Sequence, residues 1–288
     1  MGKKIAVIND LSGFGKCSLT AAIPVISVMG VQACPMPTAV LSSQTGYPSY
    51  CCYDFTDKMD NIRSEWEKLN VEFDGIYTGY VADEKQILNI LKFLDTFKKQ
   101  NTFLLTDPVM ADNGKVYSMF NENLLELMKI LIRRADIITP NLTELTLLCK
   151  ESYERLIEQK NKETFIEKIK EMALKLLDEG TKNVIVTGIP VENPDKDRID
   201  IGNLLINKSE TYLSVNPYKG ESYSGTGDIF ASVISAGVAD GRGIKESIDM
   251  AGKFIQCSIA DTCSETTDAN DGIEFEKHLG MLIRKQVK

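Results

Sequence analysis

Glycine-rich turns that open helices can bind phosphoryl oxygens, and one such turn lies in the last third of this 288-residue chain. The run Gly225-Thr226-Gly227-Asp228 precedes the apolar residues 229–239, so we expect it to open a helix. Glycines let backbone N–H groups converge, and the helix N-terminus adds about half a positive charge. The same dipole favours an ionised Asp228, which could accept a proton from an attacking hydroxyl. Taken alone, the tetrapeptide favours a simpler interpretation, an acidic helix start after a glycine turn.

A second polar junction, Thr139-Pro140-Asn141-Leu142-Thr143-Glu144, combines an expected strand end with an expected helix start. Open α/β sheets bind ligands at the carboxyl ends of their strands. Asn141 and Glu144 are one helical turn apart, so both could face one ligand or the oxygen shell of Mg²⁺. The structural alternative is a capping box, which the same spacing produces and which the motif alone favours.

Two more loops follow expected strands. Asp107 begins Asp107-Pro108-Val109-Met110 at a strand end, where it would either face a metal or phosphate or turn the chain. After the first strand, Asp10 and Ser12 could hydrogen-bond a polar ring substituent, or simply belong to a polar loop. The loop is no Walker A motif, because Cys17 stands where that motif needs Ser or Thr.

Short apolar runs alternate with helical patterns over the first 190 residues. Strands are expected over residues 4–8, 32–34, 38–41, 75–78, 102–106, 136–139 and 183–187, and helices over 18–29, 57–69, 84–97, 121–131 and 165–177, with another opening at Asn141. This alternation predicts right-handed βαβ units around a mostly parallel sheet.

The pattern changes in the last hundred residues. Residues 200–206 and 210–215 predict an antiparallel hairpin at a sheet edge, followed by helices over 227–239, 244–260 and 273–285. Since no linker or composition break interrupts the chain, residues 1–288 are expected to form a single domain.

Composition excludes several classes of protein. Hydrophobic residues make up 43% and charged residues 26%, which is typical of a globular chain. The net charge of −8 disfavours nucleic acid and anionic membranes as partners. His278 is the only histidine and the seven cysteines contain no CxxC, so we exclude zinc sites, disulfide frameworks and histidine-dependent triads. With no secretory segment or membrane span recognisable, a cytoplasmic location is expected.

Taken together, and in the order in which they occur along the chain, the four motifs resemble those of the ribokinase-like superfamily, and more narrowly those of the pyridoxal/pyridoxamine kinase family. Ser42-Ser43-Gln44-Thr45-Gly46-Tyr47 and Tyr77-Thr78-Gly79-Tyr80 add to the resemblance, which covers nearly the whole chain. It implies a three-layer α/β fold, in which helices flank a central, mostly parallel sheet with a small antiparallel edge hairpin. The implied activity is ATP-dependent phosphorylation of the 5′-hydroxymethyl group of vitamin B6 vitamers, in the salvage of pyridoxal phosphate.

The resemblance also implies a role for each candidate residue. Asp228 would be the general base, and the turn at Gly225, Thr226 and Gly227 would be the anion hole for the transferring phosphoryl group. The residues implied near the ATP phosphates are Asp107, Asn141, Glu144 and Thr187, with Asp107 and Glu144 as the Mg²⁺ residues. The residues implied or inferred for the vitamin pocket are Asp10, Ser12, Thr45 and Tyr80. A homodimer is implied, and a K⁺ requirement is left open.

Two departures from the family pattern bear on the substrate. Gln44 stands where pyridoxal kinases often carry histidine, and Asn113 follows the Asp107 loop where some relatives place an aldehyde-capturing cysteine. Neither change touches phosphoryl transfer, but both weaken the expectation of a preference for the aldehyde. Two alternatives therefore stay open: a hydroxymethylpyrimidine (phosphate) kinase of thiamine synthesis, and a catalytically silent ligand-binding protein on the same fold.

Overall fold

The structure is a computed structural model that describes residues 2–160, 164–193, 198–218, 222–263 and 268–284. The chain divides into two compact units, one formed by residues 1–103 and 219–288 and the other by residues 104–218. Each unit combines parallel strands with flanking helices, so the predicted α/β class is confirmed. The expectation of a single domain stays a prediction.

In the first unit the strands of the sheet lie in the order β4-β1-β2-β3. Strands β1 (Lys4–Ser12), β2 (Gln32–Leu41) and β4 (Gly75–Thr78) are parallel, and the short β3 (Cys52–Asp54) runs antiparallel to β2. Residues 5–8 of β1 are fully buried. The polar residues that follow them in β1 therefore come at the carboxyl end of a central strand.

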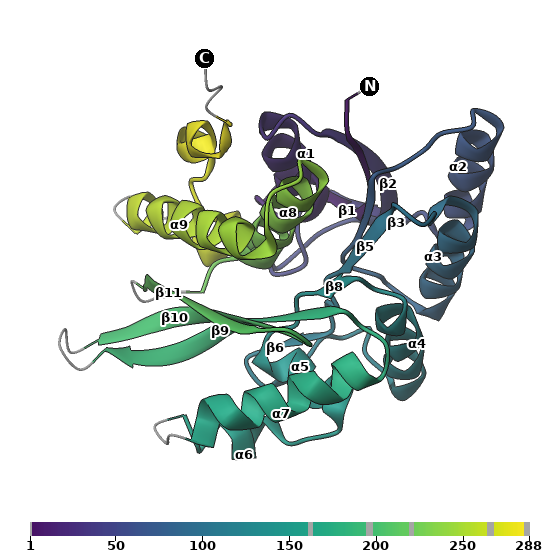
Figure 1. The fold of residues 1–288 in the computed structure, drawn as a ribbon. Helices are drawn as coiled ribbons and strands as arrows, with labels where there is room; N and C mark the ends of the chain where they lie inside the picture. The colour runs from purple at the N-terminus through teal and green to yellow at the C-terminus, as the bar shows by residue number, and fades with distance from the viewer. Residues whose placement is uncertain (1, 161–163, 194–197, 219–221, 264–267, 285–288) are drawn as a thin grey trace. The chain divides into compact units, whose positions relative to one another are not determined.

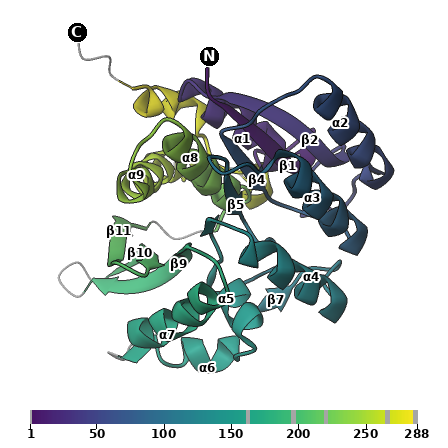
Figure 2. The same ribbon diagram turned by 45° about the vertical axis from the view of Figure 1, so that its right-hand side comes forward.

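Helices cover both faces of this sheet (Figures 1 and 2). Helices α1 (Ser18–Val28) and α8 (Thr226–Ala239) pack against β1 and against each other, and α9 (Ile244–Thr262) packs on α8. On the other face α2 (Thr56–Lys68) packs on β2 and on α3 (Glu84–Phe97). The start of α8 is thus held beside the carboxyl end of β1.

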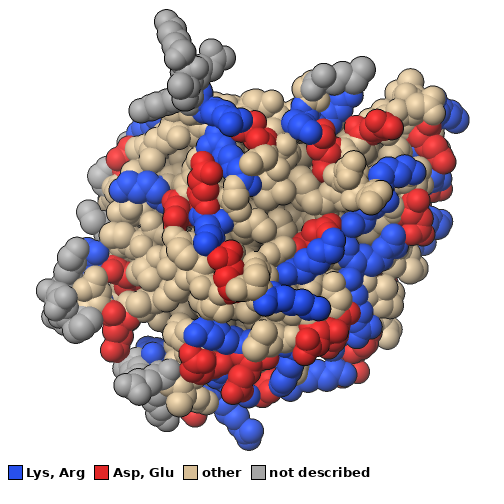
Figure 3. All heavy atoms as spheres, in the orientation of Figure 1, with Lys and Arg blue, Asp and Glu red and all other residues tan. Residues whose placement is uncertain are grey.

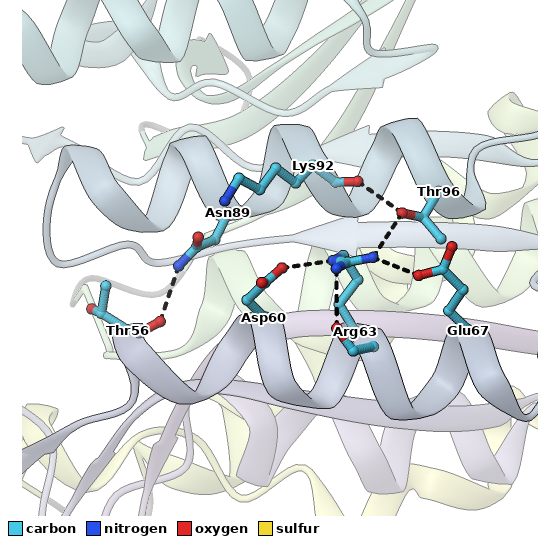
Figure 4. A network of polar contacts seen from close by, with 8 residues as sticks. Thr56, Asp60, Arg63, Glu67, Asn89, Lys92 and Thr96 are labelled. Carbon is cyan, nitrogen blue, oxygen red and sulfur yellow. Dashed lines mark hydrogen bonds and ion pairs between the residues drawn. The ribbon is translucent and has the colours of Figure 1, made fainter.

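Polar contacts join α2 to α3 (Figure 4). The Arg63 side chain is 18% exposed and donates from Nε to Asp60 at 2.7 Å and from Nη1 to Thr96 at 3.2 Å. Its Nη1 also lies 2.8 Å from Glu67. Because one side chain of α2 bonds within its own helix and to α3, it fixes how the two helices pack.

We expect Arg63→Ala to lower the free energy of unfolding by about 1 kcal/mol, since the guanidinium loses several hydrogen bonds and its packing. Lys85→Ala is the matched control, because the Lys85–Asp57 pair is 3.2 Å apart with both side chains at least 70% exposed. That substitution should change stability by only a few tenths of a kcal/mol. Urea unfolding of the two variants measures the difference, and equal losses would contradict the expectation.

The second unit carries strands in the order β5-β8-β9-β10-β11. Strands β5 (Phe103–Thr106), β8 (Ile137–Ile138) and β9 (Asn183–Asn193) are parallel. Strands β10 (Arg198–Asn207) and β11 (Thr211–Pro217) continue the sheet in antiparallel pairing. These last two strands are the antiparallel edge hairpin that the sequence predicts.

Four helices and a two-stranded ribbon complete this unit. They are α4 (Glu122–Arg133), α5 (Leu142–Cys149), α6 (Tyr153–Ile157), α7 (Thr164–Asp178), β6 (Ala111–Asp112) and β7 (Lys115–Val116). Helices α5 and α7 pack on β9, and α5 also packs on β6. The ribbon thereby holds the loop after β5 against the start of α5.

Two expected elements differ from the structure. Residues 32–41 form one strand rather than two, because β2 pairs with β1 from Gln32 to Leu41. On its other side β2 pairs with β3 only at Ala39, Val40 and Leu41. Pro35 and Pro37 come before these three residues, so their missing N–H groups remove no hydrogen bond to β3.

The helix expected over residues 273–285 is wrong. The structure has 3-10 turns at Ala269–Asp271 and Glu276–Leu282, and Lys285 lies outside the described residues. Ile273 and Phe275 are both buried, and this spacing of two residues suits an extended chain rather than a helix.

Charges are mixed on the surface. On the face drawn in Figure 3, acidic and basic side chains are interspersed over the helices. Within the described part of the chain, none of the helices is long and apolar enough to cross a membrane.

Candidate active site

Asp228 lies in the first turn of α8 and is fixed by hydrogen bonds from three segments of the first unit. Its Oδ1 accepts from Asn9 Nδ2 at 2.9 Å and from the Tyr77 hydroxyl at 3.4 Å. Its Oδ2 accepts from the Ser18 backbone N–H at 2.8 Å. The carboxylate is therefore held at the point where β1, β4 and the start of α1 meet α8.

The surroundings of Asp228 tune its protonation. The pKa of Asp228 is raised to about 6, because burial and the negative charge of Asp10 together outweigh the lowering by hydrogen bonds from Ser18, Asn9 and Tyr77. Above this pKa the group is a carboxylate and can take a proton, and below it the group is neutral and cannot. A pKa near 6 therefore suits a general base at neutral pH.

The turn before Asp228 requires glycine. Gly225 has φ 81° in the left-handed region, and an added Cβ would lie 2.0 Å from the carbonyl oxygen of Lys16. Thr226 Oγ1 donates to the carbonyl oxygen of Tyr223 at 3.2 Å and so closes the turn. The first N–H groups of α8, including that of Gly227, have no acceptor within the helix and suit an anion.

A second buried carboxylate lies close to the first. Asp10 is 5% exposed and accepts a hydrogen bond from Ser12 Oγ at 2.8 Å, and burial raises its pKa. Burial and the charge of Asp10 raise the pKa of Tyr80 to about 12, so this phenol stays neutral. The structure thus brings Asp10, Ser12 and Tyr80 to the end of the sheet that holds Asp228.

The structure does not bring Thr45 into this cluster. Thr45 is exposed in the loop between β2 and β3, and its predicted role stays a prediction. The neighbouring Gln44 is buried, with Nε2 donating to Asn270 Oδ1 at 2.9 Å and Oε1 accepting from the Gly46 N–H at 2.7 Å. The Gln44 amide therefore ties this loop to the segment around Asn270.

In the second unit, Asn141 and Glu144 form a complete capping box at the start of α5. Glu144 Oε2 accepts from the Asn141 N–H at 2.9 Å, and Oε1 accepts from the Met110 N–H at 3.1 Å. Asn141 Nδ2 donates to the Ala111 carbonyl oxygen at 2.8 Å. The structural interpretation of this motif is thus correct, and the same bonds hold the loop that follows Asp107.

Asp107 and Thr187 lie beside this capping box. Asp107 is 7% exposed and accepts from Thr139 Oγ1 at 3.0 Å. Thr187 forms an isolated parallel bridge with Asn141, and its N–H donates to the Pro140 carbonyl oxygen at 2.9 Å. Asp107 and Asn141 therefore lie at the carboxyl ends of β5 and β8, and Thr187 lies beside Asn141 within β9. The strand expected to end at Thr187 continues to Asn193, because β10 pairs with it along this length.

The electrostatics of this cluster suit a divalent cation. Glu144 is 3% exposed, and its pKa is raised well above the usual range by burial and by the negative charges of Asp107 and Asp112. A cation would relieve this repulsion. No group of three or more protein ligands occurs among the residues described. One or two carboxylates, completed by water and phosphate oxygens, are the arrangement typical of Mg²⁺ in kinases.

Three residues that contact Asp228 received no role from the sequence: Asn9, Ser18 and Tyr77. Asn9 offered a signal, since it is a polar residue directly after the apolar run of residues 5–8. Ser18 offered none, because its backbone N–H does the bonding and its positive φ of 49° depends on the tertiary fold.

Comparisons with known proteins agree with this geometry. The family model described as phosphomethylpyrimidine kinase matches residues 15–272. A pyridoxal kinase of Dictyostelium discoideum is 27% identical over 267 residues, which cover 87% of this chain and 82% of the relative. The chain also resembles a solved candidate phosphomethylpyrimidine kinase of Bacteroides thetaiotaomicron, in its crystal form with pyridoxal, at 39% identity and a TM-score of 0.90.

That structure covers 100% of this chain and 98% of its own. A pyridoxal kinase of Lactobacillus plantarum has a TM-score of 0.83 at 25% identity, and the match covers 97% of this chain and 96% of the other. The predicted ribokinase-like fold and the predicted family are thus confirmed, and the chain has the fold of a phosphotransferase. The chain belongs to the phosphomethylpyrimidine kinase family, and pyridoxal kinases are among the relatives of the chain.

Proposed function

We propose that this protein transfers the γ-phosphoryl group of ATP to the 5′-hydroxymethyl group of a vitamin B6 vitamer. The observation that carries the proposal is the Asp228 carboxylate, with a pKa of about 6, in the first turn of the helix that the Gly225 turn opens. A group that accepts a proton is thereby joined to a helix start that attracts phosphoryl oxygens.

In the proposed reaction Asp228 accepts the proton of the substrate hydroxymethyl group. The hydroxymethyl oxygen then forms a bond to the γ-phosphorus, and the bond from that phosphorus to the bridging oxygen of ADP breaks. The N–H groups at the start of α8 stabilise the negative charge on the transferring phosphoryl oxygens. Positioning and charge stabilisation supply most of the acceleration in such transfers.

We assign the nucleotide and Mg²⁺ to the cluster around Asp107 in the second unit. Asp107 and Glu144 are the carboxylates for the metal, and Asn141 and Thr187 lie beside them for the nucleotide. Since backbone N–H groups already engage both oxygens of Glu144, its main contribution is to fix the loop that follows Asp107. When bound, Mg²⁺ would neutralise charge on the phosphate oxygens.

The proposed role of Asp107 in binding Mg²⁺ can be tested by one substitution. Asp107→Asn keeps an oxygen for the Thr139 hydroxyl but removes a charge, so the half-saturating Mg²⁺ concentration should rise by about tenfold or more. Glu151→Gln, which removes a half-buried charge paired with Lys175 at 3.1 Å, should leave the half-saturating Mg²⁺ concentration unchanged. Initial rates against free Mg²⁺ measure this, and an unchanged requirement in Asp107→Asn would contradict the assignment.

Asp10, Ser12 and Tyr80 are assigned to the substrate ring, with Thr45 from the β2–β3 loop. A buried carboxylate with its neighbouring hydroxyl suits the polar substituents of a pyridine ring. The second candidate substrate is hydroxymethylpyrimidine or its phosphate, which the description of the matched family favours. A B6 vitamer and hydroxymethylpyrimidine each present a free hydroxymethyl group, so the reaction at Asp228 is the same for these two. In the phosphate of hydroxymethylpyrimidine the acceptor would instead be a phosphate oxygen.

The choice is tested by rates of ADP release with pyridoxal, pyridoxamine, pyridoxine and hydroxymethylpyrimidine at equal concentrations. We expect kcat/KM to be highest for a B6 vitamer. A higher kcat/KM for hydroxymethylpyrimidine would assign the chain to the second candidate. Tight binding of a vitamer without ADP release would favour the silent ligand-binding protein.

Other expectations from the family stay predictions that we carry into the proposal. One is a homodimer. The cytoplasmic location expected from the sequence also stays a prediction, and the K⁺ requirement stays open.

A further inference from the structure

Asn9 is a fully buried side chain whose amide has only one possible orientation. Its Oδ1 accepts from the backbone N–H groups of Tyr80 at 2.9 Å and of Asp10 at 3.0 Å. Backbone N–H groups can only donate, so the atom facing them must be the oxygen. The NH₂ group is then directed at Asp228 Oδ1, 2.9 Å away.

Gly79 closes the other side of this amide. An added Cβ at position 79 would lie 2.5 Å from Asn9 Nδ2 and 2.7 Å from its Cγ. The Gly79 N–H also donates to the Ile8 carbonyl oxygen at 2.9 Å, which fixes the end of β4 against β1. The Asn9 amide therefore has neither the room to rotate nor a second set of partners that would accept the flipped orientation.

We propose that Asn9 is a positioning residue, which holds the Asp228 carboxylate in its working orientation through the Nδ2 hydrogen bond, and that Gly79 provides the space this amide needs. The Ser18 N–H, 2.8 Å from Oδ2, holds the other oxygen. The roles that we assign to Asp228 and Tyr80 do not include the hydrogen bond from Asn9 to Asp228. The inference rests on the proposed role of Asp228 as the base.

The titratable groups that face Asp228 are Asp10 in β1, Cys17 before α1 and Tyr77 in β4. The pKa of Cys17 is raised to about 12 by burial and by the charges of Asp228 and Asp10, so this thiol is neutral. Asp10 raises the pKa of Asp228, whereas Tyr77 and Asn9 lower it by donating hydrogen bonds. Asn9 thus counters the repulsion from Asp10.

Asn9→Asp separates this role from simple packing. The new side chain has nearly the same shape and keeps an oxygen for the N–H groups of Tyr80 and Asp10. It replaces the donor to Asp228 by an acceptor, so the proton on Asp228 is held more tightly. Because the base must be ionised, the acid side of the pH profile should move to higher pH.

The matched control is Gln86→Glu, the same change from amide to carboxylate at another fully buried position of the first unit. Gln86 Oε1 accepts from the Ala82 N–H at 2.8 Å and Nε2 donates to the Thr38 carbonyl oxygen at 2.9 Å. This side chain has no hydrogen bond with Asp228. The control should lose stability but keep the wild-type pH midpoint.

The experiment measures kcat/KM from pH 5 to 9 and the pKa of Asp228 by carboxyl ¹³C NMR, with Asp228→Asn identifying the resonance. In Asn9→Asp we expect the midpoint of the pH profile and the pKa of Asp228 both to rise by about one pH unit or more, and kcat/KM at pH 7 to fall at least about twofold. Should Asn9→Asp fail to fold, Gly79→Ala provides the second variant, since its Cβ displaces the amide. It should raise both midpoints and lower kcat more than it changes KM.

An Asp228 pKa that stays at its wild-type value in the folded variant would overturn the inference, whatever the activity. A shift of the same size in Gln86→Glu would also overturn it, because the effect would then be a general loss of packing. Absence of turnover in the wild type would instead count against the proposed function, and the NMR measurement would still decide the role of Asn9.

Discussion

Asp228→Asn should lower kcat by at least about 10², with a much smaller change in KM, because the substitution removes the group that accepts the substrate proton. An amide at this position also presents its NH₂ group to a partner that donates, either the Ser18 N–H or Asn9 Nδ2. Steady-state kinetics at pH 7.5 measure the loss for the B6 vitamers and for hydroxymethylpyrimidine.

Asp240→Asn is the matched control, since Asp240 caps the opposite end of the same helix and pairs with Arg242 at 3.3 Å. It should leave kcat within about a factor of two, as expected for a partly exposed ion pair. A wild-type kcat in Asp228→Asn, or equal losses in the two variants, would contradict the role of Asp228 as base.

The pH profile adds an independent check on the same residue. The pKa of Asp228 is raised to about 6 by burial, so kcat/KM should fall as the pH drops below that value and level off above it. The acid limb should be missing from the residual activity of Asp228→Asn. A limb that persists at the same pH in the variant would belong to another group.

Gly225→Ala should have the second largest effect, because two separate costs coincide at that position. The φ of 81° is unfavourable for a residue with a Cβ, and that Cβ would lie 2.0 Å from the Lys16 carbonyl oxygen. The turn must shift, which moves the first N–H groups of α8 and the carboxylate behind them. We expect kcat to fall by about 10² or more, as happens when groups that stabilise developing charge are displaced.

Gly30→Ala is the control for strain alone. Gly30 has nearly the same φ, 84°, in the first unit, but an added Cβ there meets no atom within 4 Å. It should cost about 1 kcal/mol of stability and no activity. If Gly225→Ala lost no more activity than Gly30→Ala at a temperature where both are folded, the turn would not be part of the catalytic machinery.

The fold could be predicted from periodicity to a large extent. Ile87, Ile90 and Leu94 recur at helical spacing and are all buried in α3, so the pattern identified both the helix and its inner face. The alternation of such helices with apolar runs was enough to predict parallel strands. The expected C-terminal helix is wrong because the buried residues Ile273 and Phe275 and the bonds of Lys16 to Glu274 and Glu276 are tertiary features.

For the candidate site, the sequence predicts the positions of the main residues but not their hydrogen-bond partners. Asp228, Asp107 and Asn141 stand beside Gly and Pro signals that mark element ends, so their positions could be predicted. Their partners could not, because Asn9 and Ser18 are more than 200 residues from Asp228 and contact it only through the sheet. The amide of Gln44 shows the same limit, since its bonds to Asn270 link distant segments.

The most direct test of the account is the identity of the product formed from ATP, Mg²⁺ and a B6 vitamer. We expect one phosphate ester at the 5′-hydroxymethyl oxygen, formed in equal amount to ADP, and ³¹P NMR identifies it by the coupling of the phosphorus to the methylene protons. Release of inorganic phosphate in place of an ester, or no loss of ATP with any of the hydroxymethyl compounds, would contradict it.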